Sequence, residues 1–356
     1  MTDFLDSIKK SVRAIEAYHL KERQYRIKLN QNENPHDLPA WLKREILEEA
    51  ATLNWNRYPH FDNDRLKSAL AHYLDVAKER ILLGNGSNEL LQILTHAVLS
   101  EGRRLLIVQP TFTVYQQLAR VAGAELIELD FAKDWSFPVD DIVDRIKKTH
   151  PHLTILCAPN SPTGADLPEE ALEEIVSAAS GLVLADEAYH GFSGRDYIPL
   201  QKNHRNLIVT RTFSKAMGLA GLRIGYMLAD PGLIVQINKG KLPYNLNIFS
   251  ELVACKLIAH QDLVNSCARE IIGERQRVSR ALAALEQVRV FPSASNFLMI
   301  ETPLPGKVLF EDVYSTGILI RDISGYHPRL TNALRISIGT TSENDALLDV
   351  MGSRLK

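Results

Sequence analysis

A lysine that lies behind an apolar strand and two hydroxyl residues is the side chain of this sequence best suited to covalent chemistry. Lys215 follows Thr212 and Ser214 at the end of that strand. Because desolvation lowers the pKa of an ammonium group, such a lysine can become the neutral amine that forms a Schiff base with an aldehyde cofactor. Thr212, Ser214 and the later Arg223 are donors suited to a phosphate. Taken alone, the segment could also be a strand, a loop and a structural arginine.

A carboxylate and a phenol stand at the end of a second apolar stretch. The predicted strand 182–185 leads into Asp186, and Tyr189 follows shortly after. Ligands of open α/β sheets bind at the carboxyl ends of the strands, so Asp186 can pair with a buried cation such as a protonated pyridine nitrogen. Tyr189 can reach the phenolic oxygen of the same ring. A magnesium site or a helix N-cap would look similar at this one position.

Three further loops carry groups of the same kind. The turn after strand 153–157 is rich in proline and would aim Asn160 at the same edge, although such turns are common without function. The sequence GNGSNELL at 84–91 enters an apolar helix, whose N-terminal N–H groups and dipole would hold a phosphate. An Asn-Gly hairpin turn is the alternative there. Phe112, after strand 105–108, could stack on an aromatic ring or belong to the core.

These groups need a sheet to position them, and the chain predicts one. Apolar runs of four or five residues alternate with helical segments from about residue 80 to residue 230, which is typical of successive βα units. Several runs are almost wholly apolar, as buried parallel strands should be. We therefore predict an α/β fold with a mostly parallel sheet, whose strands are 105–108, 125–129, 153–157, 182–185, 207–210 and 223–228.

The pattern changes at both ends of the chain. After about residue 265 a long charged helix leads into short strands at 297–300, 318–321 and 334–338, which indicates a smaller α+β domain. The first 26 residues are predicted to form an amphipathic helix, an arm that precedes a strand at 26–29. The predicted division is an arm at 1–26, a small domain from 27–44 and 266–356, and a large domain at 45–265.

Composition excludes several classes of protein. The 356 residues include 41 Lys and Arg against 43 Asp and Glu, with 45% hydrophobic residues, which is typical of a folded soluble protein without a nucleic-acid footprint. Charges run through the first thirty residues, and no stretch approaches the length of a membrane span. We therefore expect a cytoplasmic protein with reduced cysteines, no membrane partner and no metal site.

In this order along the chain, the clusters resemble those of the fold-type I pyridoxal-5'-phosphate (PLP) aminotransferases, and within them the histidinol-phosphate aminotransferases. The resemblance covers almost the whole length. It is carried by the loop at 84–91 and by LNQNENP at 29–35, RYP at 57–59, PTF at 110–112, NSPTG at 160–164, DEAY at 186–189, SK at 214–215, GLRIG at 221–225, IRD at 320–322 and LRISIGT at 334–340.

The resemblance implies a role for each matching residue. Lys215 would hold PLP and act as the general acid and base. Asp186 would keep the ring nitrogen protonated, and Asn160 and Tyr189 would bind the ring oxygen. The other implied cofactor residues are Phe112 on the ring and, around the phosphate, Gly86, Ser87, Asn88, Thr212, Ser214, Arg223 and Tyr58, the last from the neighbouring subunit of a homodimer. The implied substrate residues are Tyr18, Asn32, Arg321 and Arg335.

The resemblance also implies the reaction, which is transamination between L-histidinol phosphate and 2-oxoglutarate in histidine biosynthesis. An aromatic amino-acid aminotransferase and a threonine-phosphate decarboxylase share these motifs and remain alternatives. The βα pattern alone would also permit a nicotinamide dehydrogenase, but the complete glycine fingerprint is missing. A non-catalytic binding protein is disfavoured, because Lys215, Asp186 and Arg223 are all present.

Overall fold

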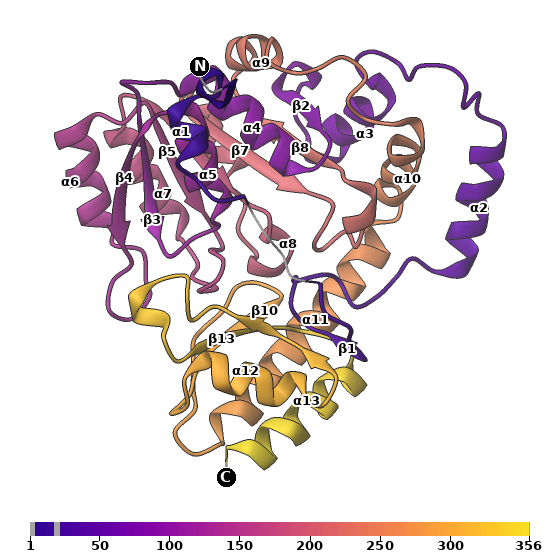
Figure 1. Ribbon diagram of the computed structural model, residues 1–356. Coiled ribbons are helices and arrows are strands. Elements are labelled where there is room, and N and C mark those ends of the chain that lie inside the picture. The colour runs from indigo at the N-terminus through magenta and orange to yellow at the C-terminus, as the bar shows by residue number, and fades with distance from the viewer. Residues whose placement is uncertain (1–3, 18–21, 356) are drawn as a thin grey trace.

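The larger part of the molecule is built around a seven-stranded sheet (Figure 1). The computed structural model describes residues 4–17 and 22–355. The strand order is β2-β8-β7-β6-β5-β3-β4, and neighbours are parallel except at β8, which is antiparallel to β2 and β7. The strands are β2 (Ile81–Gly84), β3 (Arg104–Gln109), β4 (Glu125–Asp130), β5 (Leu153–Cys157), β6 (Leu182–Asp186), β7 (Leu207–Thr212) and β8 (Gly225–Leu228). The prediction of a mostly parallel sheet is confirmed, whereas strand β2 was not predicted.

Helices cover both faces of this sheet because alternate residues of each strand point to opposite sides. Leu105 and Ile107 of β3 belong to a core with helices α4, α5 and α9, and Leu106 and Val108 to a core with α2, α3, α6, α7 and α10. Burial on both faces explains the nearly continuous apolar strands. The helices are α2 (Ala40–Ala51), α3 (Asp64–Leu74), α4 (Ser87–Val98), α5 (Val114–Ala122), α6 (Val139–Thr149), α7 (Glu169–Ala178), α8 (His190–Ser193), α9 (Pro231–Asn238) and α10 (Ile248–Ile258).

The C-terminal part builds a third core beside the carboxyl edge of the large sheet (Figure 1). An antiparallel sheet in the order β12-β13-β10-β9 packs on helices, and β1 pairs in parallel with β11. The elements are β1 (Ile27–Lys28), α11 (Gln261–Ala283), β9 (Arg289–Val290), β10 (Phe297–Glu301), α12 (Gly306–Tyr314), β11 (Ile318–Leu319), β12 (Arg321–Asp322), β13 (Ala333–Ser337) and α13 (Thr341–Arg354). The 3-10 helices are η1 (Phe4–Ser7), η2 (Lys78–Arg80), η3 (Ile198–Lys202), η4 (Ala220–Leu222) and η5 (Pro328–Leu330).

The predicted long N-terminal helix is wrong within the described residues. Only η1 and α1 (Lys10–Arg13) are helical there, and residues 22–26 are not. Helices this short are marginal without tertiary packing, and α1 has no side-chain cap and no buried residue. It packs against α5.

The predicted domain boundary at residue 44 falls inside α2, whose Leu42 and Ile46 join the core of the large sheet. The division into an arm and two domains stays a prediction. In residues 4–17 and 22–355 no helix is both long and apolar enough to cross a membrane.

Candidate active site

The strand order places a crevice at the carboxyl edge of the large sheet. In the strand order β6-β5-β3-β4, strand β3 is followed in the chain by β4 on one side, and β5 is followed by β6 on the other. The connections after β3 and β5 therefore leave in opposite directions. Such a switch in strand order is where open α/β sheets bind ligands. The loops after β3, β5 and β7 bring Phe112, Ser161 and Lys215 to this edge. Asp186 ends β6 at the same edge, and the four residues surround one cavity.

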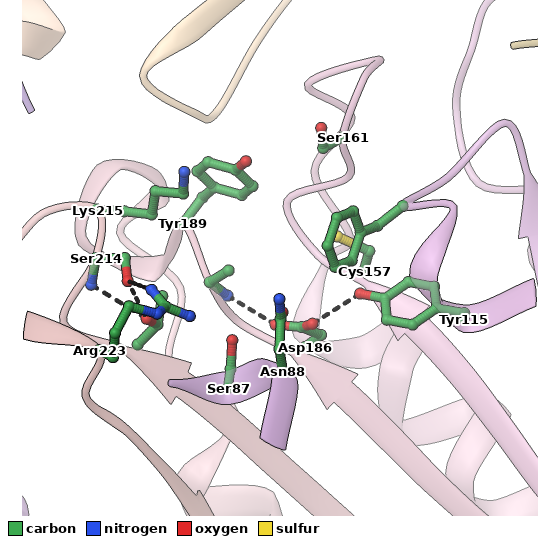
Figure 2. A pocket seen from close by; sticks show the side chains of 13 residues that line it. Ser87, Asn88, Tyr115, Cys157, Ser161, Asp186, Tyr189, Ser214, Lys215 and Arg223 are labelled. Atoms are coloured by element: carbon green, nitrogen blue, oxygen red, sulfur yellow. Dashed lines mark hydrogen bonds between the residues drawn. The ribbon is translucent and has the colours of Figure 1, made fainter. Parts of the chain in front are cut away.

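This cavity of about 180 Å³ gathers most of the predicted cofactor residues (Figure 2). Predicted residues that line it are Ser87, Asn88, Phe112, Asp186, Tyr189, Thr212, Ser214, Lys215 and Arg223. Residues that line it without having been predicted are Tyr115, Cys157, Ser161 and Ala188.

Lys215 carries an amine that is easy to deprotonate. Its Nζ lies 2.9 Å from the backbone oxygen of Gln31, to which it donates. Burial and, to a lesser extent, the nearby charge of Arg335 lower the pKa of Lys215 to about 7, and Glu33 opposes the shift. A large fraction of the amine is therefore neutral near neutral pH, which is the form that attacks a carbonyl.

Asp186 is a buried carboxylate held by neutral donors, as Figure 2 shows. Only 3% of the residue is exposed. Its Oδ2 accepts a bond of 2.7 Å from the Tyr115 hydroxyl, and its Oδ1 accepts one of 3.1 Å from the Ala188 amide. Burial raises the pKa of Asp186, and these two bonds oppose the shift. A cation on the cavity side of the carboxylate would complete its environment.

Hydroxyl groups, an arginine and a helix N-terminus converge at the other end of the cavity. Arg223 Nη1 donates to Ser214 Oγ at 3.2 Å, and Thr212 Oγ1 donates to the same oxygen at 3.0 Å. Gly86 caps α4 with φ of 78°, and a Cβ there would lie 2.4 Å from Arg223 Nη2. Glycine thus lets the guanidinium lie against the start of α4, where N–H groups favour an anion.

The predicted strand 223–228 begins too early. Strand β8 starts at Gly225, and Arg223 has φ of 53°, a left-handed conformation that no strand residue adopts. This turn directs the arginine toward Ser214, and the prediction failed because a pattern of apolar residues does not reveal one turned residue.

A second cavity of about 170 Å³ adjoins the first and shares Lys215 and Tyr189 with it. Its cations are Arg321 and Arg335, and it also includes Asn32. Arg335 is 8% exposed and donates through Nη1 to Ser161 Oγ at 2.9 Å and through Nη2 to the Asn30 oxygen at 2.8 Å. Arg321 Nε donates to the same oxygen at 3.2 Å. Two guanidinium groups near one amine can bind a substrate anion.

Asn160 does not line either cavity. Its Nδ2 donates to the Pro110 oxygen and to Thr163 Oγ1, each at 2.9 Å, and its Oδ1 accepts from Thr111 Oγ1 at 2.8 Å. These bonds tie the turn after β5 to the loop after β3. Its predicted contact with a cofactor stays a prediction.

Of the two predicted tyrosines of the N-terminal quarter, Tyr58 does not line either cavity. Tyr58 is 81% exposed and stacks on Tyr244 with ring centroids 4.5 Å apart. Tyr18 lies outside the described residues.

Tyr115 is the most informative residue that sequence reasoning missed. It is fully buried on α5, where an aromatic residue is normally read as core, and its bond to Asp186 is made across two elements far apart in sequence. The only available signal was its position shortly after Phe112 on the helix that follows β3.

The residues present fit PLP, which carries a phosphate, an aromatic ring with a basic nitrogen and an aldehyde. The cavity offers an anion cradle at Gly86 and Arg223, an aromatic side chain in Phe112, and a buried carboxylate without a charged partner among the described residues, Asp186. Lys215 supplies the amine. Fold and site together define a PLP-dependent transferase of fold type I.

The chain belongs to the aminotransferase class I and II family, whose model matches residues 25–351. It is 39% identical over 339 residues to the histidinol-phosphate aminotransferase of Chlorobaculum tepidum, covering 95% of this chain and 97% of that protein. The histidinol-phosphate aminotransferase of Sinorhizobium meliloti, solved in complex with PLP, superposes with a TM-score of 0.85 at 25% identity, covering 94% and 92% of the two chains.

The same fold also serves a different reaction. An L-threonine-O-3-phosphate decarboxylase from Porphyromonas gingivalis superposes with a TM-score of 0.81 at 21% identity, covering 92% of this chain and 99% of that chain. The predictions of fold class, family and cofactor are confirmed.

Proposed function

We propose that this enzyme exchanges an amino group between L-histidinol phosphate and 2-oxoglutarate, giving imidazole-acetol phosphate and L-glutamate, a step of histidine biosynthesis. The observation that carries the proposal is the Lys215 amine at the junction of two cavities, of which one fits PLP and the other holds Arg321 and Arg335. The match to the C. tepidum enzyme over nearly the whole chain supports this choice of substrate.

Each group of the first cavity has one task. When bound, PLP supplies an electron-withdrawing ring that makes the substrate Cα proton acidic. Lys215 would hold the cofactor through its amine and would move the substrate Cα proton. Asp186 would keep the ring nitrogen protonated, and Tyr189 would donate to the ring oxygen. Phe112 would stack on the ring.

The phosphate of the cofactor would lie at the N-terminus of α4. The groups proposed to hold it are Gly86, Ser87, Asn88, Thr212, Ser214 and Arg223, together with Tyr58 of a second subunit. Backbone N–H groups, hydroxyls and a guanidinium are the donors that phosphate prefers.

Both substrates use the second cavity. Histidinol phosphate presents a phosphate where glutamate presents a carboxylate, and a planar guanidinium can bind either with two hydrogen bonds. Arg335 binds this anion with help from Arg321, and Asn32 lines the cavity. A role for Tyr18 in substrate binding remains part of the proposal.

Arg335→Lys is expected to lower kcat/KM for histidinol phosphate about 10- to 100-fold, because lysine keeps the charge and loses the two-pronged geometry. Steady-state kinetics measure the effect. Arg275→Lys is the matched control, since Arg275 is a partly buried arginine that bonds the Ser295 carbonyl away from both cavities. An unchanged kcat/KM for Arg335→Lys would contradict the assignment.

PLP capture by the apoenzyme is expected to speed up with pH. The neutral amine is the reactive form, and the pKa of Lys215 is lowered to about 7. Its neutral fraction, and with it the capture rate, should therefore rise about tenfold from pH 6 to pH 8. Stopped-flow absorbance after mixing apoenzyme with PLP measures the rate. A rate that is flat over this range would show that the amine does not titrate there.

We further propose that the enzyme works as a homodimer. Two segments with exposed apolar side chains, 55–61 and 242–244, meet where Tyr244 contacts both Tyr58 and Phe61. We call their exposed residues the apolar patch; they are Trp55, Tyr58, Phe61, Leu242 and Tyr244. Clustered exposed aromatic side chains are typical of interaction sites. Tyr58 lies outside its own cavity and within this patch, which supports its assignment to the cofactor of the partner.

Leu242→Asp is expected to convert the dimer to a monomer, because it places a charge in the apolar patch at a residue that is 74% exposed in the single chain. Sedimentation velocity at micromolar protein measures the change. Val235→Asp is the control, since Val235 is an exposed apolar residue of α9 outside the patch. A dimer that survives Leu242→Asp would place the interface elsewhere.

The substrate assignment is tested by rates with histidinol phosphate, phenylalanine and threonine phosphate, each with 2-oxoglutarate. The highest kcat/KM is expected with histidinol phosphate. A higher value with phenylalanine would favour the aromatic aminotransferase, and release of carbon dioxide from threonine phosphate would favour the decarboxylase. The cytoplasmic location stays a prediction of the sequence.

A further inference from the structure

We propose that Ser337 is a positioning residue which, through Asn32, turns the hydroxyl proton of Tyr189 into the cofactor cavity. Ser337 Oγ lies 2.8 Å from the Asn32 amide nitrogen and 2.9 Å from Asn32 Oδ1, and Asn32 Nδ2 lies 2.9 Å from the Tyr189 hydroxyl. All three residues are buried. The inference rests on the proposed contact between Tyr189 and the cofactor.

The direction of each hydrogen bond in this chain follows from one unambiguous donor. A backbone N–H can only donate, so Ser337 Oγ accepts from the Asn32 amide. A carbonyl oxygen can only accept, so Ser337 must donate its own proton to Asn32 Oδ1. The side-chain amide of Asn32 then presents Nδ2 to Tyr189, whose oxygen accepts.

The reverse orientation of the Asn32 amide is unfavourable. Ser337 Oγ would then face two donors, and within the described part of the chain its own proton would have no acceptor, although the residue is only 3% exposed. A buried donor without a partner is costly, so the network fixes the orientation of the amide.

Because the Tyr189 oxygen accepts from Asn32, its proton must point elsewhere. Tyr189 lies on the wall of both cavities, so the proton is available to an acceptor on the cofactor or the substrate. The charged groups that face the phenol are Arg335 and Lys215. A guanidinium carries no acceptor, and Lys215 Nζ lies 5.7 Å from the centroid of the Tyr189 ring. Ser161 is the other hydroxyl near Tyr189 and accepts from Arg335.

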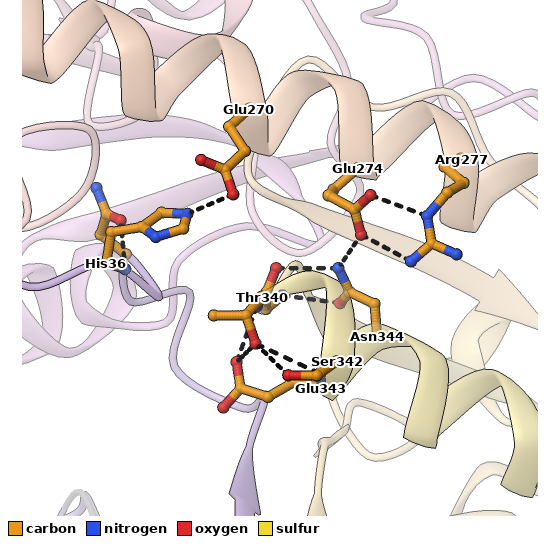
Figure 3. Close-up of polar contacts among 10 residues, drawn as sticks. His36, Glu270, Glu274, Arg277, Thr340, Ser342, Glu343 and Asn344 are labelled. Atoms are coloured by element: carbon orange, nitrogen blue, oxygen red, sulfur yellow. Dashed lines mark hydrogen bonds and ion pairs between the residues drawn. The ribbon is translucent and has the colours of Figure 1, made fainter.

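Ser337 is suited to this task because its position is rigid. It is the last residue of β13, and the turn that follows is held by Asn344, which bonds both the nitrogen and the oxygen of Gly339 at 2.9 Å (Figure 3). Thr340 and Glu343 form a capping box at the start of α13. These contacts fix the end of β13, and with it the position of Ser337 relative to Asn32.

Asn296 holds the backbone of Asn32 in place. Its Nδ2 donates to the Asn32 backbone oxygen at 3.0 Å, and its own backbone oxygen accepts from the Ile338 amide. Asn32 has φ of 55°, a left-handed conformation that asparagine tolerates better than most residues. Arg335 and Ser337 point to the same face of β13, so one strand positions both the proposed anion site and the phenol of the cofactor site.

The test is a pH titration of the visible absorption of PLP-loaded enzyme. A ring oxygen that receives less of the Tyr189 proton carries more negative charge and holds neighbouring protons more tightly. Ser337→Ala should therefore raise the midpoint of this titration, the pH at which half of the absorption change has occurred, by about 0.5 to 1 pH unit. Tyr189→Phe should shift the midpoint in the same direction. Ser337→Thr keeps the hydroxyl and should restore the wild-type midpoint.

Two further variants keep the test decisive. Asn32→Asp preserves the bond from Ser337 but offers Tyr189 only acceptors, so it should raise the midpoint even if Ser337→Ala does not fold. Ser295→Ala is the matched control, because Ser295 is buried beside Asn296 and its hydroxyl has no hydrogen-bond partner among the described residues. Its midpoint should stay at the wild-type value.

The outcomes separate the possible failures. If Tyr189→Phe moves the midpoint and Ser337→Ala and Asn32→Asp do not, the role of Ser337 is wrong and the proposed function stands. If Ser161→Ala moves it in place of Ser337→Ala, Ser161 orients the phenol and the inference is overturned. If Tyr189→Phe has no effect, the proposed contact of Tyr189 with the cofactor fails, and the inference fails with it.

Discussion

Lys215→Ala is expected to lower kcat/KM at least about 10³-fold while the fold stays intact, because the variant loses both the covalent attachment of PLP and the group that moves the Cα proton. Among the described residues, Lys215 Nζ hydrogen-bonds only the Gln31 oxygen, so removal of the amine disturbs few polar contacts. Steady-state kinetics with histidinol phosphate measure the loss, and circular dichroism measures the fold.

The attachment itself can be tested separately. Borohydride reduction of wild-type enzyme loaded with PLP, followed by peptide mass spectrometry, should place the cofactor on Lys215. Lys256→Ala is the control, since Lys256 is a lysine that pairs with Glu45 and Glu49 outside both cavities. Full activity of Lys215→Ala, or trapped cofactor on another residue, would remove the basis of the proposed function.

Asp186→Asn is expected to lower kcat/KM about 10²- to 10³-fold, the second-largest effect. Asparagine has nearly the same shape and keeps a group that can meet Tyr115, but it has no charge with which to stabilise a protonated ring nitrogen. The ring then withdraws electrons less strongly, and the Cα proton becomes harder to remove. The loss should appear mainly in kcat, because the phosphate contacts at the other end of the cavity are unaffected.

The neighbouring residue provides the control for this variant. Glu187 is also buried, but it pairs with Arg211 and the Tyr197 amide and does not line the cofactor cavity. Glu187→Gln should lower the free energy of unfolding by about 1 to 3 kcal/mol, as expected for a disturbed buried ion pair, and leave the chemical step nearly unchanged. Equal losses of kcat in the two variants would mean that Asp186 acts through the fold alone.

Several predictions made from the sequence succeeded because they rest on burial. Strand β5 was predicted with its observed bounds, since both of its faces are covered and all of its residues except Thr154 are apolar. Asp186, the last residue of β6, and Lys215, shortly after β7, lie at the carboxyl edge of the sheet as predicted, because polar groups at or just beyond the ends of such strands must lie there. The N-terminal helix was not predictable in the same way, because short exposed segments have little burial to fix them.

The sequence by itself determined which groups are available: an amine, a carboxylate and donors suited to a phosphate at one edge of a mostly parallel sheet, with Arg321 and Arg335 on the later strands β12 and β13. Only the tertiary structure decided how these groups are held, because the contacts join residues far apart in the chain. Tyr115 meets Asp186 across the edge of the large sheet, and Ser337 meets Asn32 across more than three hundred residues. Hydrogen bonds depend on distances of a few tenths of an ångström, which periodicity in a sequence does not encode.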